Sequence, residues 1–341
     1  MRRIGCGLAA IALLTGVPAA AQTPRAPAPS QRIEISAQLI EAFDPRDTTQ
    51  TQFGALRFRG GLLLTSPHRE FGGLSALRMI GDGTRFIAVT DKGNWLRARI
   101  VYRDGRPIAI ADAEMAPMLG PDGRPITNRR GWYDSESLAE DGGTLYVGLE
   151  RVHEILRFDY GKDGLLARGQ PVAVPPGVKA LPNNAGLECL VMPPKGLPFA
   201  GSLIAISERG LDPAGNILGF LVGPGFGPAS GAFTVKRTDE FDVSDCAVTP
   251  RGDLLLLERR FSWTRGIAFR IRRVPLARVM PRALLDGPEV IFADMGYQLD
   301  NMEGLSVHRA ADGALVLTLI SDDNFSPLQR TVLLQFTMVG E

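Results

Sequence analysis

The sequence repeats one short pattern, in which an acidic residue opens an apolar strand and a second acidic residue closes the next strand. The clearest copy is "SESLAEDGGTLYVGLER" at residues 135–151, opened by Glu136 and closed by Glu150. Fixed-period repeats of this length mean that one small structural unit is built several times over. The other copies are "LECLVMPPKGLPFAGSLIAISERG" (187–210), "SDCAVTPRGDLLLLERR" (244–260), "MEGLSVHRAADGALVLTLISDDN" (302–324) and a weaker one, "GGLSALRMIGDGTRFIAVTDKG" (72–93).

The spacing of these acids predicts a β-propeller. The opening acids Glu136, Glu188, Asp245 and Glu303 lie 52, 57 and 58 residues apart, and the closing acids Asp91, Glu150, Glu208, Glu258 and Asp322 lie 59, 58, 50 and 64 residues apart. Units of this length with short strands and Gly/Pro turns are typical of propeller blades. We therefore predict an all-β fold, a propeller of six blades of four-stranded antiparallel sheets, with five blades as the alternative.

Closure of the ring involves the N-terminal strands. Five units are visible from residue 72 onward, and the last one lacks a fourth strand. Because a ring leaves no free sheet edge, strands within 32–43 and 53–66 are expected to complete the final blade and to supply most of a sixth. Helical periodicity is weak, and the one short helix expected lies within 274–285, where Pro281 interrupts it.

The N-terminal residues have the composition of an export signal. Arg2 and Arg3 precede a short apolar stretch, and Ala19–Ala21 read as a cleavage site. We predict a signal peptide at 1–21, a Pro/Ala-rich linker at 22–32 and a single propeller domain at 33–341. The protein is then periplasmic or secreted and has no membrane span after signal cleavage.

Charge and cysteine content restrict the partners and the compartment. The formal charge is +1 and the signs are mixed along the chain, so no basic footprint for nucleic acid exists. We expect a monomer that acts on a small molecule. Cys189 and Cys246 each follow an acidic residue in successive repeats. A disulfide between adjacent blades is one interpretation, and two free buried side chains is the one we favour.

Rotation about the propeller axis should collect the acids at one end of the channel. First strands run away from that end and second strands return to it, so both sets of acids meet there. Three interpretations remain open. The acids could pair with the basic residues that follow them, such as Lys92, Arg151, Arg209 and Arg259. They could hold a divalent cation, Ca²⁺ above all, because carboxylates are the ligands that it prefers. They could also be solvated.

Motifs of other hydrolase and nucleotide-binding classes are missing. The sequence contains no G-x-S-x-G elbow and no P-loop. Of its three histidines, His153 follows a closing acid and is the candidate general base. Glu188 and Glu303 are the candidate catalytic carboxylates, and Arg151, Arg209 and Arg259 are candidates for binding an anionic substrate. Trp95 and Trp263 lie in loops that should border the channel and are candidate substrate walls.

Several motifs resemble those of a known family. "FGGLSAL", "DSESLA", "GLECLV" and "EGLSV", each followed by an apolar strand that ends in "TDKG", "LER", "SERG" or "SDDN", are similar to the esterase-like phytase family of secreted bacterial proteins. The resemblance covers about residues 70–338. More loosely, the pattern is similar to calcium-dependent propeller hydrolases of the paraoxonase and gluconolactonase group.

The resemblance implies an exported hydrolase of phosphate or carboxylic esters. In this hypothesis a Ca²⁺ ion is held at the channel by some of Glu136, Glu188, Asp245, Glu303, Asp91, Glu150, Glu208, Glu258 and Asp322, and the substrate is a small ester. The alternative is a periplasmic propeller without catalytic activity, which binds a ligand or a protein at the same place.

Overall fold

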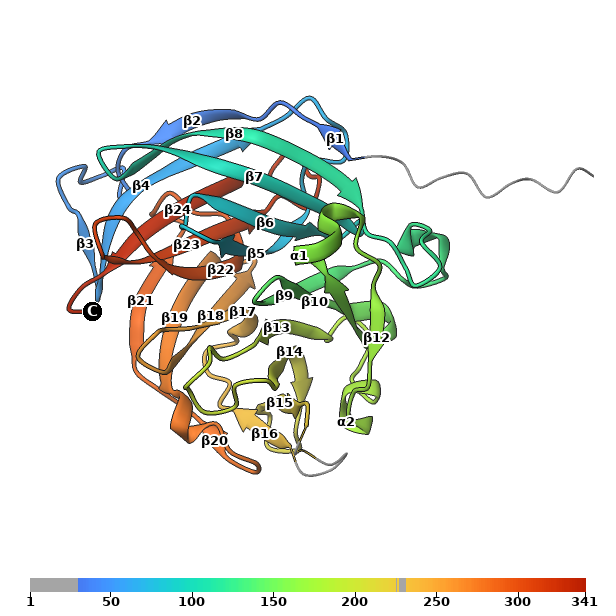
Figure 1. The fold of residues 1–341 in the computed structure, drawn as a ribbon. Helices are drawn as coiled ribbons and strands as arrows, with labels where there is room; N and C mark the ends of the chain where they lie inside the picture. Colours follow the sequence, from blue (N-terminus) through green and yellow to red (C-terminus); the bar gives the residue numbers. More distant parts are fainter. Residues whose placement is uncertain (1–29, 225, 227–230) are drawn as a thin grey trace, which may run out of the picture.

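The chain forms five antiparallel sheets arranged in a ring (Figure 1). The computed structural model describes residues 30–341 except residue 225 and residues 227–230. The predicted signal peptide and most of the predicted linker lie outside these residues. The propeller prediction is confirmed, with five blades, the alternative, and not six. No helix in the described part of the chain is long and apolar enough to cross a bilayer.

Blades 1 and 2 come from the first half of the chain. Blade 1 contains, from the axis outward, β5 (Leu74–Ile80), β6 (Arg85–Thr90), β7 (Asn94–Arg103), β8 (Arg106–Pro117) and β1 (Gln31–Arg32). Blade 2 contains β9 (Ser135–Asp141), β10 (Thr144–Leu149), β11 (Glu154–Asp159) and β12 (Gln170–Val172). Strand pairing thus begins at β1, within the last two residues of the predicted linker.

Blades 3 and 4 follow the same order from the axis outward. Blade 3 contains β13 (Leu187–Val191), β14 (Leu203–Leu211), β15 (Ile217–Val222), β16 (Ala232–Val235) and β20 (Leu284–Leu285), which pairs parallel to β16. Blade 4 contains β17 (Asp242–Val248), β18 (Asp253–Ser262), β19 (Gly266–Pro275) and β21 (Glu289–Asp294).

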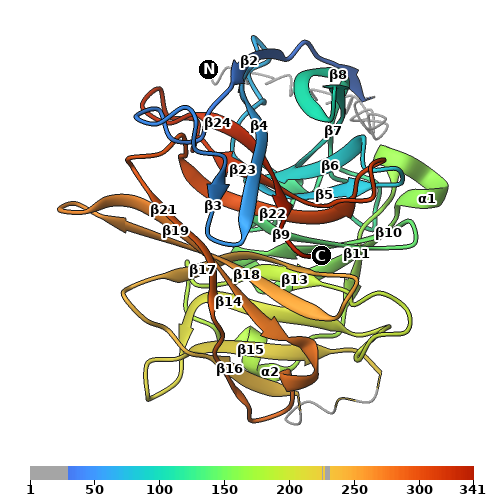
Figure 2. The same ribbon diagram turned by 90° about the vertical axis from the view of Figure 1, so that its left-hand side faces the viewer.

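Blade 5 joins the two ends of the described chain. Its inner strands are β22 (Asn301–Arg309), β23 (Leu315–Asp322) and β24 (Thr331–Met338), and its outer strands are β4 (Leu56–Thr65), β2 (Ser36–Ile40) and β3 (Gln52–Phe53). Figures 1 and 2 both show β4 beside the C-terminal strands. The N-terminal strands therefore complete the final blade as predicted. The expectation of a sixth blade is wrong, because β2 to β4 all join this sheet.

Helical structure is confined to short turns. The two α-helical turns are α1 (Tyr160–Asp163) and α2 (Pro176–Lys179), and the 3-10 turns are η1 (Ile126–Asn128), η2 (Glu150–Val152), η3 (Gly164–Leu166) and η4 (Leu276–Arg278). The helix expected within 274–285 is reduced to η4, since the segment then extends into β20.

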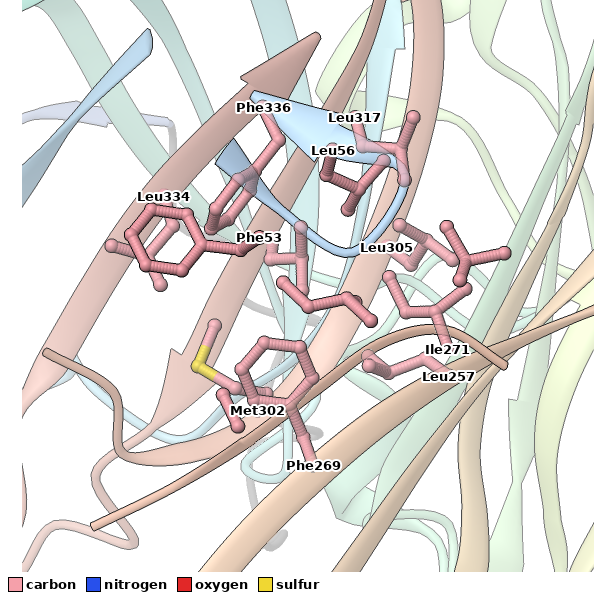
Figure 3. Packing of buried hydrophobic residues seen from close by; sticks show 14 of the residues in the cluster. Phe53, Leu56, Leu257, Phe269, Ile271, Met302, Leu305, Leu317, Leu334 and Phe336 are labelled. Carbon is pink, nitrogen blue, oxygen red and sulfur yellow. The ribbon is translucent and has the colours of Figure 1, made fainter. Parts of the chain in front are cut away.

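The hydrophobic core is divided among the five interfaces between blades. Each apolar cluster combines residues from two adjacent blades, as in the cluster between blades 4 and 5 (Figure 3), which contains Leu257, Phe269, Leu317 and Phe336. The inner strands are apolar on both faces because both faces are covered by neighbours, which explains continuous runs such as "DLLLLE". This packing fixes the inner strands, and so positions the residues at their ends.

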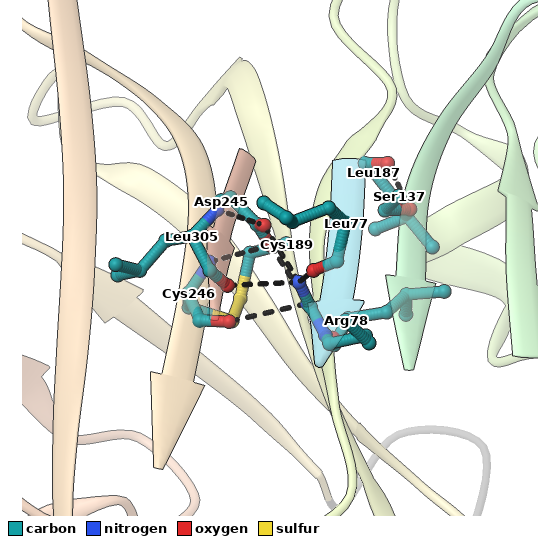
Figure 4. Close-up of a disulfide and its surroundings, with 9 residues drawn as sticks. Leu77, Arg78, Ser137, Leu187, Cys189, Asp245, Cys246 and Leu305 are labelled. Atoms are coloured by element: carbon teal, nitrogen blue, oxygen red, sulfur yellow. Dashed lines mark hydrogen bonds and ion pairs between the residues drawn. A yellow bond between two sulfur atoms is a disulfide. The ribbon is translucent and has the colours of Figure 1, made fainter. Parts of the chain in front are cut away.

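A disulfide joins Cys189 of β13 to Cys246 of β17, the innermost strands of blades 3 and 4 (Figure 4). The interpretation as two free buried side chains is therefore corrected. The Cα atoms lie 5.2 Å apart, within the usual range for a disulfide. The bond ties adjacent blades together beside the channel.

Candidate functional site

The five innermost strands share a β-bulge close to their first residue. In each blade one residue there has no partner on the second strand, and the register shifts across it. A bulge re-aims a side chain and is frequent beside active sites. The bulged residues, in blade order, are Ser75, Glu136, Glu188, Ser244 and Glu303.

The second strand of each blade supplies a matching residue at the same end of the channel. On the first strand, the residue just before the bulge pairs with a residue of the second strand. The matching residue is the next one along the chain after that partner. In blade 2, for example, Leu149 pairs with Ser135 and the matching residue is Glu150. The matching residues, in blade order, are Asp91, Glu150, Glu208, Arg259 and Asp322.

The sequence-based alignment of blade 4 is wrong by one residue. It predicted Asp245 and Glu258 at this end of the channel, where the structure has Ser244 and Arg259. Successive residues of a strand point to opposite faces, so a shift of one residue removes the carboxylate from the site. In blade 1 the bulged position is occupied by Ser75, which carries no carboxylate.

Both displaced carboxylates have arginine partners. Asp245 binds Arg78, with 2.7 Å between Oδ2 and Nη1. Glu258 is fully buried and accepts hydrogen bonds from Arg270 Nε at 2.8 Å and Arg272 Nη2 at 2.6 Å. Both carboxylates are therefore ion-paired, but not with the bases that follow the closing acids: Asp245 pairs with Arg78 of another blade, and Glu258 pairs with two arginines of its own blade.

The remaining acids form a cluster that we call the acid mouth. Two groups of three carboxylates, Asp134–Glu136–Glu150 and Glu150–Glu188–Glu208, have oxygens within 4.8 Å of one another. Glu150 belongs to both groups, so the carboxylates of blades 2 and 3 are continuous. The acid mouth consists of Asp91, Asp134, Glu136, Glu150, Glu188, Glu208, Glu303, Asp322 and Asp323, together with Arg259.

Backbone and side-chain donors hold several of these carboxylates in place. The Gly186 N–H donates to Glu150 Oε1 at 3.1 Å, and Ser75 Oγ donates to Asp91 Oδ1 at 2.6 Å. A Cβ atom at position 186 would lie 2.4 Å from Glu150 Cγ, so glycine is required for this approach. Blade 3 thus positions an acid of blade 2.

The donor set fits a hard divalent cation. All the acidic ligands are carboxylate oxygens, the type that Ca²⁺ prefers and binds in flexible geometry. Glu188 is 4 % exposed, and its Oε2 is buried without a hydrogen-bond partner among the described residues. An unsatisfied buried carboxylate oxygen is costly unless a proton or a cation compensates it. The buried acidic cluster is therefore able to bind a metal ion.

Burial and mutual repulsion make these carboxyl groups weak acids. Burial, reinforced by neighbouring carboxylates, raises the pKa of Glu136 and of Glu188 well above the ordinary value. Burial raises the pKa of Glu303 to about 7 although Arg259 opposes the shift, and raises that of Asp322 to about 9. In the absence of a cation, protons must therefore neutralise part of the cluster.

Arg259 is the basic residue that blade 4 contributes to the acid mouth. Its Nη2 lies 3.2 Å from Glu208 Oε1 and 3.2 Å from Glu303 Oε1, and Nη1 lies 3.3 Å from Asn301 Oδ1. The same Asn301 donates to Glu303 Oε1 at 2.7 Å. Arg259 thus connects blades 3 and 5, whereas Glu136 and Glu150 of blade 2 form no ion pair among the described residues.

The two other predicted arginines lie at the rim. Arg151 and Arg209 are about half exposed. Arg151 Nε binds Asp134 Oδ2 at 2.7 Å within blade 2, whereas Arg209 lies 3.3 Å from Glu208 and 3.6 Å from Asp242 of the next blade. The expected contact with the next blade is present for Arg209 and Arg259 and absent for Arg151.

Three further predicted residues, Trp95, Trp263 and His153, also lie outside the acid mouth. Trp95 is 1 % exposed and packs edge-on against Phe158, so it belongs to the core. Trp263 is 93 % exposed on the β18–β19 hairpin. His153 is buried, and burial lowers its pKa; the charge of Lys179 acts in the same direction and the Leu181 backbone opposes it. Its role as general base finds no support in this position.

A recess lies next to the acid mouth. It has a volume of about 440 Å³ and is lined by Asp91, Lys92, Thr127, Tyr133, Asp134 and Phe325. A larger cavity of about 920 Å³ lies between the strands of blade 1 and α1, is lined by residues that include Arg85, Arg97 and Tyr160, and contains none of the clustered acids. We therefore take the recess as the place where a small molecule would meet the carboxylates.

Sequence reasoning missed Asp134 as a member of the site. It directly precedes β9 in "YDSES", and its backbone links two acids, since its N–H donates to Asp91 O at 2.7 Å and its O accepts from Glu150 N at 2.9 Å. A second acid two residues before Glu136 was the available signal. No comparable signal identified Ser75 and Ser244 as bulged residues, because the repeat was recognised by its acidic residues.

Comparison with known proteins places the chain in a family. The family model described as phytase-like, esterase-like activity of phytase, matches residues 69–325. The chain belongs to this family. The resemblance found in the sequence motifs is thereby confirmed for the phytase-like protein. Curated protein sequences give no match.

Solved structures resemble the phytase-like protein only distantly. An endo-arabinase from Bacteroides thetaiotaomicron is 13 % identical, with a TM-score of 0.47 over 78 % of this chain and 94 % of its own. An aldose sugar dehydrogenase from Streptomyces coelicolor is 12 % identical, with a TM-score of 0.43 over 81 % and 97 %. A putative 6-phosphogluconolactonase from Bacteroides uniformis is 15 % identical, with a TM-score of 0.35 over 91 % and 83 %. Similarity at this level supports no argument about function.

Proposed function

We propose that the phytase-like protein is an ester hydrolase assisted by a divalent cation and that the reaction takes place at the acid mouth. The observation that carries the proposal is the continuous set of carboxylates in blades 2 and 3, in which one buried oxygen of Glu188 has no partner. The family description, esterase-like activity of phytase, agrees with this chemistry.

The cation would be held by Glu150 together with Asp134 and Glu136, or by Glu150 together with Glu188 and Glu208, because the carboxylate oxygens of each set lie within 4.8 Å of one another. Glu208 also contacts Arg259 Nη2 at 3.2 Å, so the second set lies directly beside the Arg259–Glu303 contact. A bound Ca²⁺ would polarise the ester oxygen and lower the pKa of a water molecule.

Glu303 is the candidate for moving a proton. Its pKa of about 7 is matched to proton transfer near neutral pH. Asn301 and Arg259 both contact Oε1, so they fix the orientation of this carboxyl group. Arg259 also places a positive charge next to the carboxylates, where it would stabilise negative charge that develops on the ester.

Substitution of the two carboxylates tests the proposal. Glu188→Gln and Glu303→Gln should each lower the hydrolysis of phenyl acetate and 4-nitrophenyl phosphate in Ca²⁺ at least tenfold, and chelation should abolish the wild-type activity. Glu289→Gln, in the outer strand β21, is the matched control and should leave activity unchanged. Full activity in the Glu188→Gln/Glu303→Gln double variant with intact circular dichroism would refute the proposal.

A binding protein without catalytic activity is the second candidate. It is favoured by the absence of any histidine among the metal-competent clusters of the described residues, which leaves carboxyl groups as the available bases. Calorimetry that shows Ca²⁺ binding to a protein without activity on either ester class would select this candidate.

Export to the periplasm or the medium is also part of the proposal. The Cys189–Cys246 disulfide supports it, because disulfides form and persist in oxidising compartments. Cell fractionation and N-terminal sequencing of the mature protein would test it, and a cytoplasmic protein with free thiols would contradict it.

A further inference from the structure

The recess beside the acid mouth is lined by two aromatic and two acidic side chains. Tyr133 and Phe325 form its apolar sides, whereas Asp91 and Asp134 connect it to the clustered carboxylates. Its volume of about 440 Å³ is within the range of small-molecule sites, which are mostly apolar with a few polar groups that fix orientation. The recess therefore has the composition of a specificity pocket.

Phe325 is held in place by an unusual backbone. Asn324 and Phe325 have φ angles of 48° and 50°, a left-handed conformation that is costly for residues other than glycine and that gathers at functional sites. The N–H groups of these two residues donate to Asp322 Oδ1 at 2.7 Å and Asp323 Oδ1 at 3.0 Å. Two members of the acid mouth thus also fix this wall.

The segment before β5 leaves room for the phenyl ring of Phe325. Gly73 lies beneath Phe325, and a Cβ atom at position 73 would lie 2.4 Å from Phe325 Cε2. The Gly73 N–H donates to Asp323 Oδ1 at 3.0 Å, the oxygen that also accepts from Phe325. Blades 5 and 1 therefore both contribute to placing the Phe325 ring in the wall of the recess.

Two cations accompany the aromatic walls. Lys92 Nζ lies 3.3 Å from the centre of the Phe325 ring, and the Arg151 guanidinium carbon lies 5.1 Å from the centre of the Tyr133 ring. Both cations are exposed. A ligand with an aromatic ring can stack between such groups, because cations and ring faces attract each other.

We propose that this recess binds the aryl group of a carboxylic ester, so that Tyr133 and Phe325 determine substrate specificity. This inference rests on the proposed ester hydrolysis and adds its substrate class. The apolar ring would occupy the recess and the ester group would lie toward Asp91, Asp134 and the acid mouth. A polyphosphate is disfavoured there, because Arg151 is already paired with Asp134 and the lining otherwise offers Lys92 beside two carboxylates, and like charges repel at short range.

Paired substrates separate specificity from reactivity. Phe325→Ala and Tyr133→Ala should each lower kcat/KM for phenyl acetate at least fivefold, mainly through KM, and change kcat/KM for ethyl acetate less than twofold. Phe325→Leu should retain an intermediate preference. Phe261→Ala, on the exposed β18–β19 hairpin, is the matched control and should change neither value.

Two results would overturn the inference. One is an unchanged ratio of the two esters in Phe325→Ala and Tyr133→Ala. The other is faster phosphate release from phytate than hydrolysis of phenyl acetate by the wild type. If no ester is hydrolysed, the proposed function fails, and the recess is tested by calorimetry with phenol. Binding of phenol that is lost in Phe325→Ala supports the recess, whereas no binding to the wild type refutes it.

Discussion

Arg78 of blade 1 binds both carboxylate oxygens of Asp245 of blade 4, with 2.7 Å between Nη1 and Oδ2 and 2.8 Å between Nη2 and Oδ1 (Figure 4). The guanidinium group also donates to the backbone carbonyls of Leu190 and Leu305, in blades 3 and 5. Arg78 lies three residues along β5 from the bulged Ser75, so this pair crosses the channel behind the acid mouth.

The first prediction concerns the stability that this pair provides. Asp245→Ala should lower the free energy of unfolding by about 3–5 kcal/mol, because it leaves a buried guanidinium without its counter-charge. Urea unfolding measures the loss. Asp112→Asn, which removes the charge partner of Arg99 in an exposed pair and suits the left-handed backbone at this position, should cost no more than about 1 kcal/mol. Equal losses in the two variants would contradict the prediction.

The second prediction is that the calcium-free protein loses stability as pH rises from about 6.5 to about 9. Glu303 and Asp322 have raised pKa values of about 7 and about 9 in the folded protein, so the folded state binds more protons than the unfolded state in this window. Below pH 6.5 the slope is mixed, because burial lowers the pKa of His308 to about 4 and gives it the opposite effect.

Calorimetry in excess chelator between pH 6.5 and 9 checks this dependence. The Glu303→Gln/Asp322→Asn double variant should show a flatter profile, since neither replacement titrates. A wild-type Tm that is constant or rises across the window would show that these carboxyl groups are not held as weak acids.

The third prediction concerns competition between protons and the cation. Ca²⁺ should raise Tm more at pH 8 than at pH 5.5, because it must displace protons from the acid mouth. Differential scanning calorimetry with 1 mM Ca²⁺ or chelator gives the two shifts. Glu188→Gln should reduce the shift at pH 8, whereas an identical shift in that variant would exclude Glu188 as a ligand.

The fourth prediction concerns Arg259. Arg259→Gln removes the positive charge next to Glu208 and Glu303 and should lower Tm more in chelator than in saturating Ca²⁺, because the cation then compensates the extra repulsion. Arg265→Gln, which removes the partner of Glu240 in an exposed pair, is the control. An equal decrease in Tm with and without Ca²⁺ would show that the charge of Arg259 does not affect the metal centre.

The sequence was sufficient to predict the propeller and the gathering of acids, because both follow from a repeat that can be counted. It was insufficient for blade 4, where Ser244 and Asp245 are adjacent, as are Glu258 and Arg259. Either residue of each pair fits the repeat, and only the bulge decides which one faces the mouth. A bulge depends on pairing with another strand, so it cannot be recognised from the sequence of one strand.

The number of blades could not be counted from strands alone. The segments 32–43 and 53–66 contain β2 and β4, which suggested material for a sixth blade but are both outer strands of blade 5. The left-handed backbone conformation of Phe325 could also not be predicted from the sequence, since phenylalanine rarely adopts it. Asp134 could have been found from its position directly before β9.

The pairing of Leu62 in β4 with Leu333 in β24 has a consequence for biosynthesis. β4 emerges from the ribosome or translocon long before its partner exists, and contacts between such distant segments form slowly. The first strands to be synthesised are therefore among the last to be placed. Until the C-terminal strands arrive, the nascent chain presents an unpaired β4 edge that needs protection from aggregation.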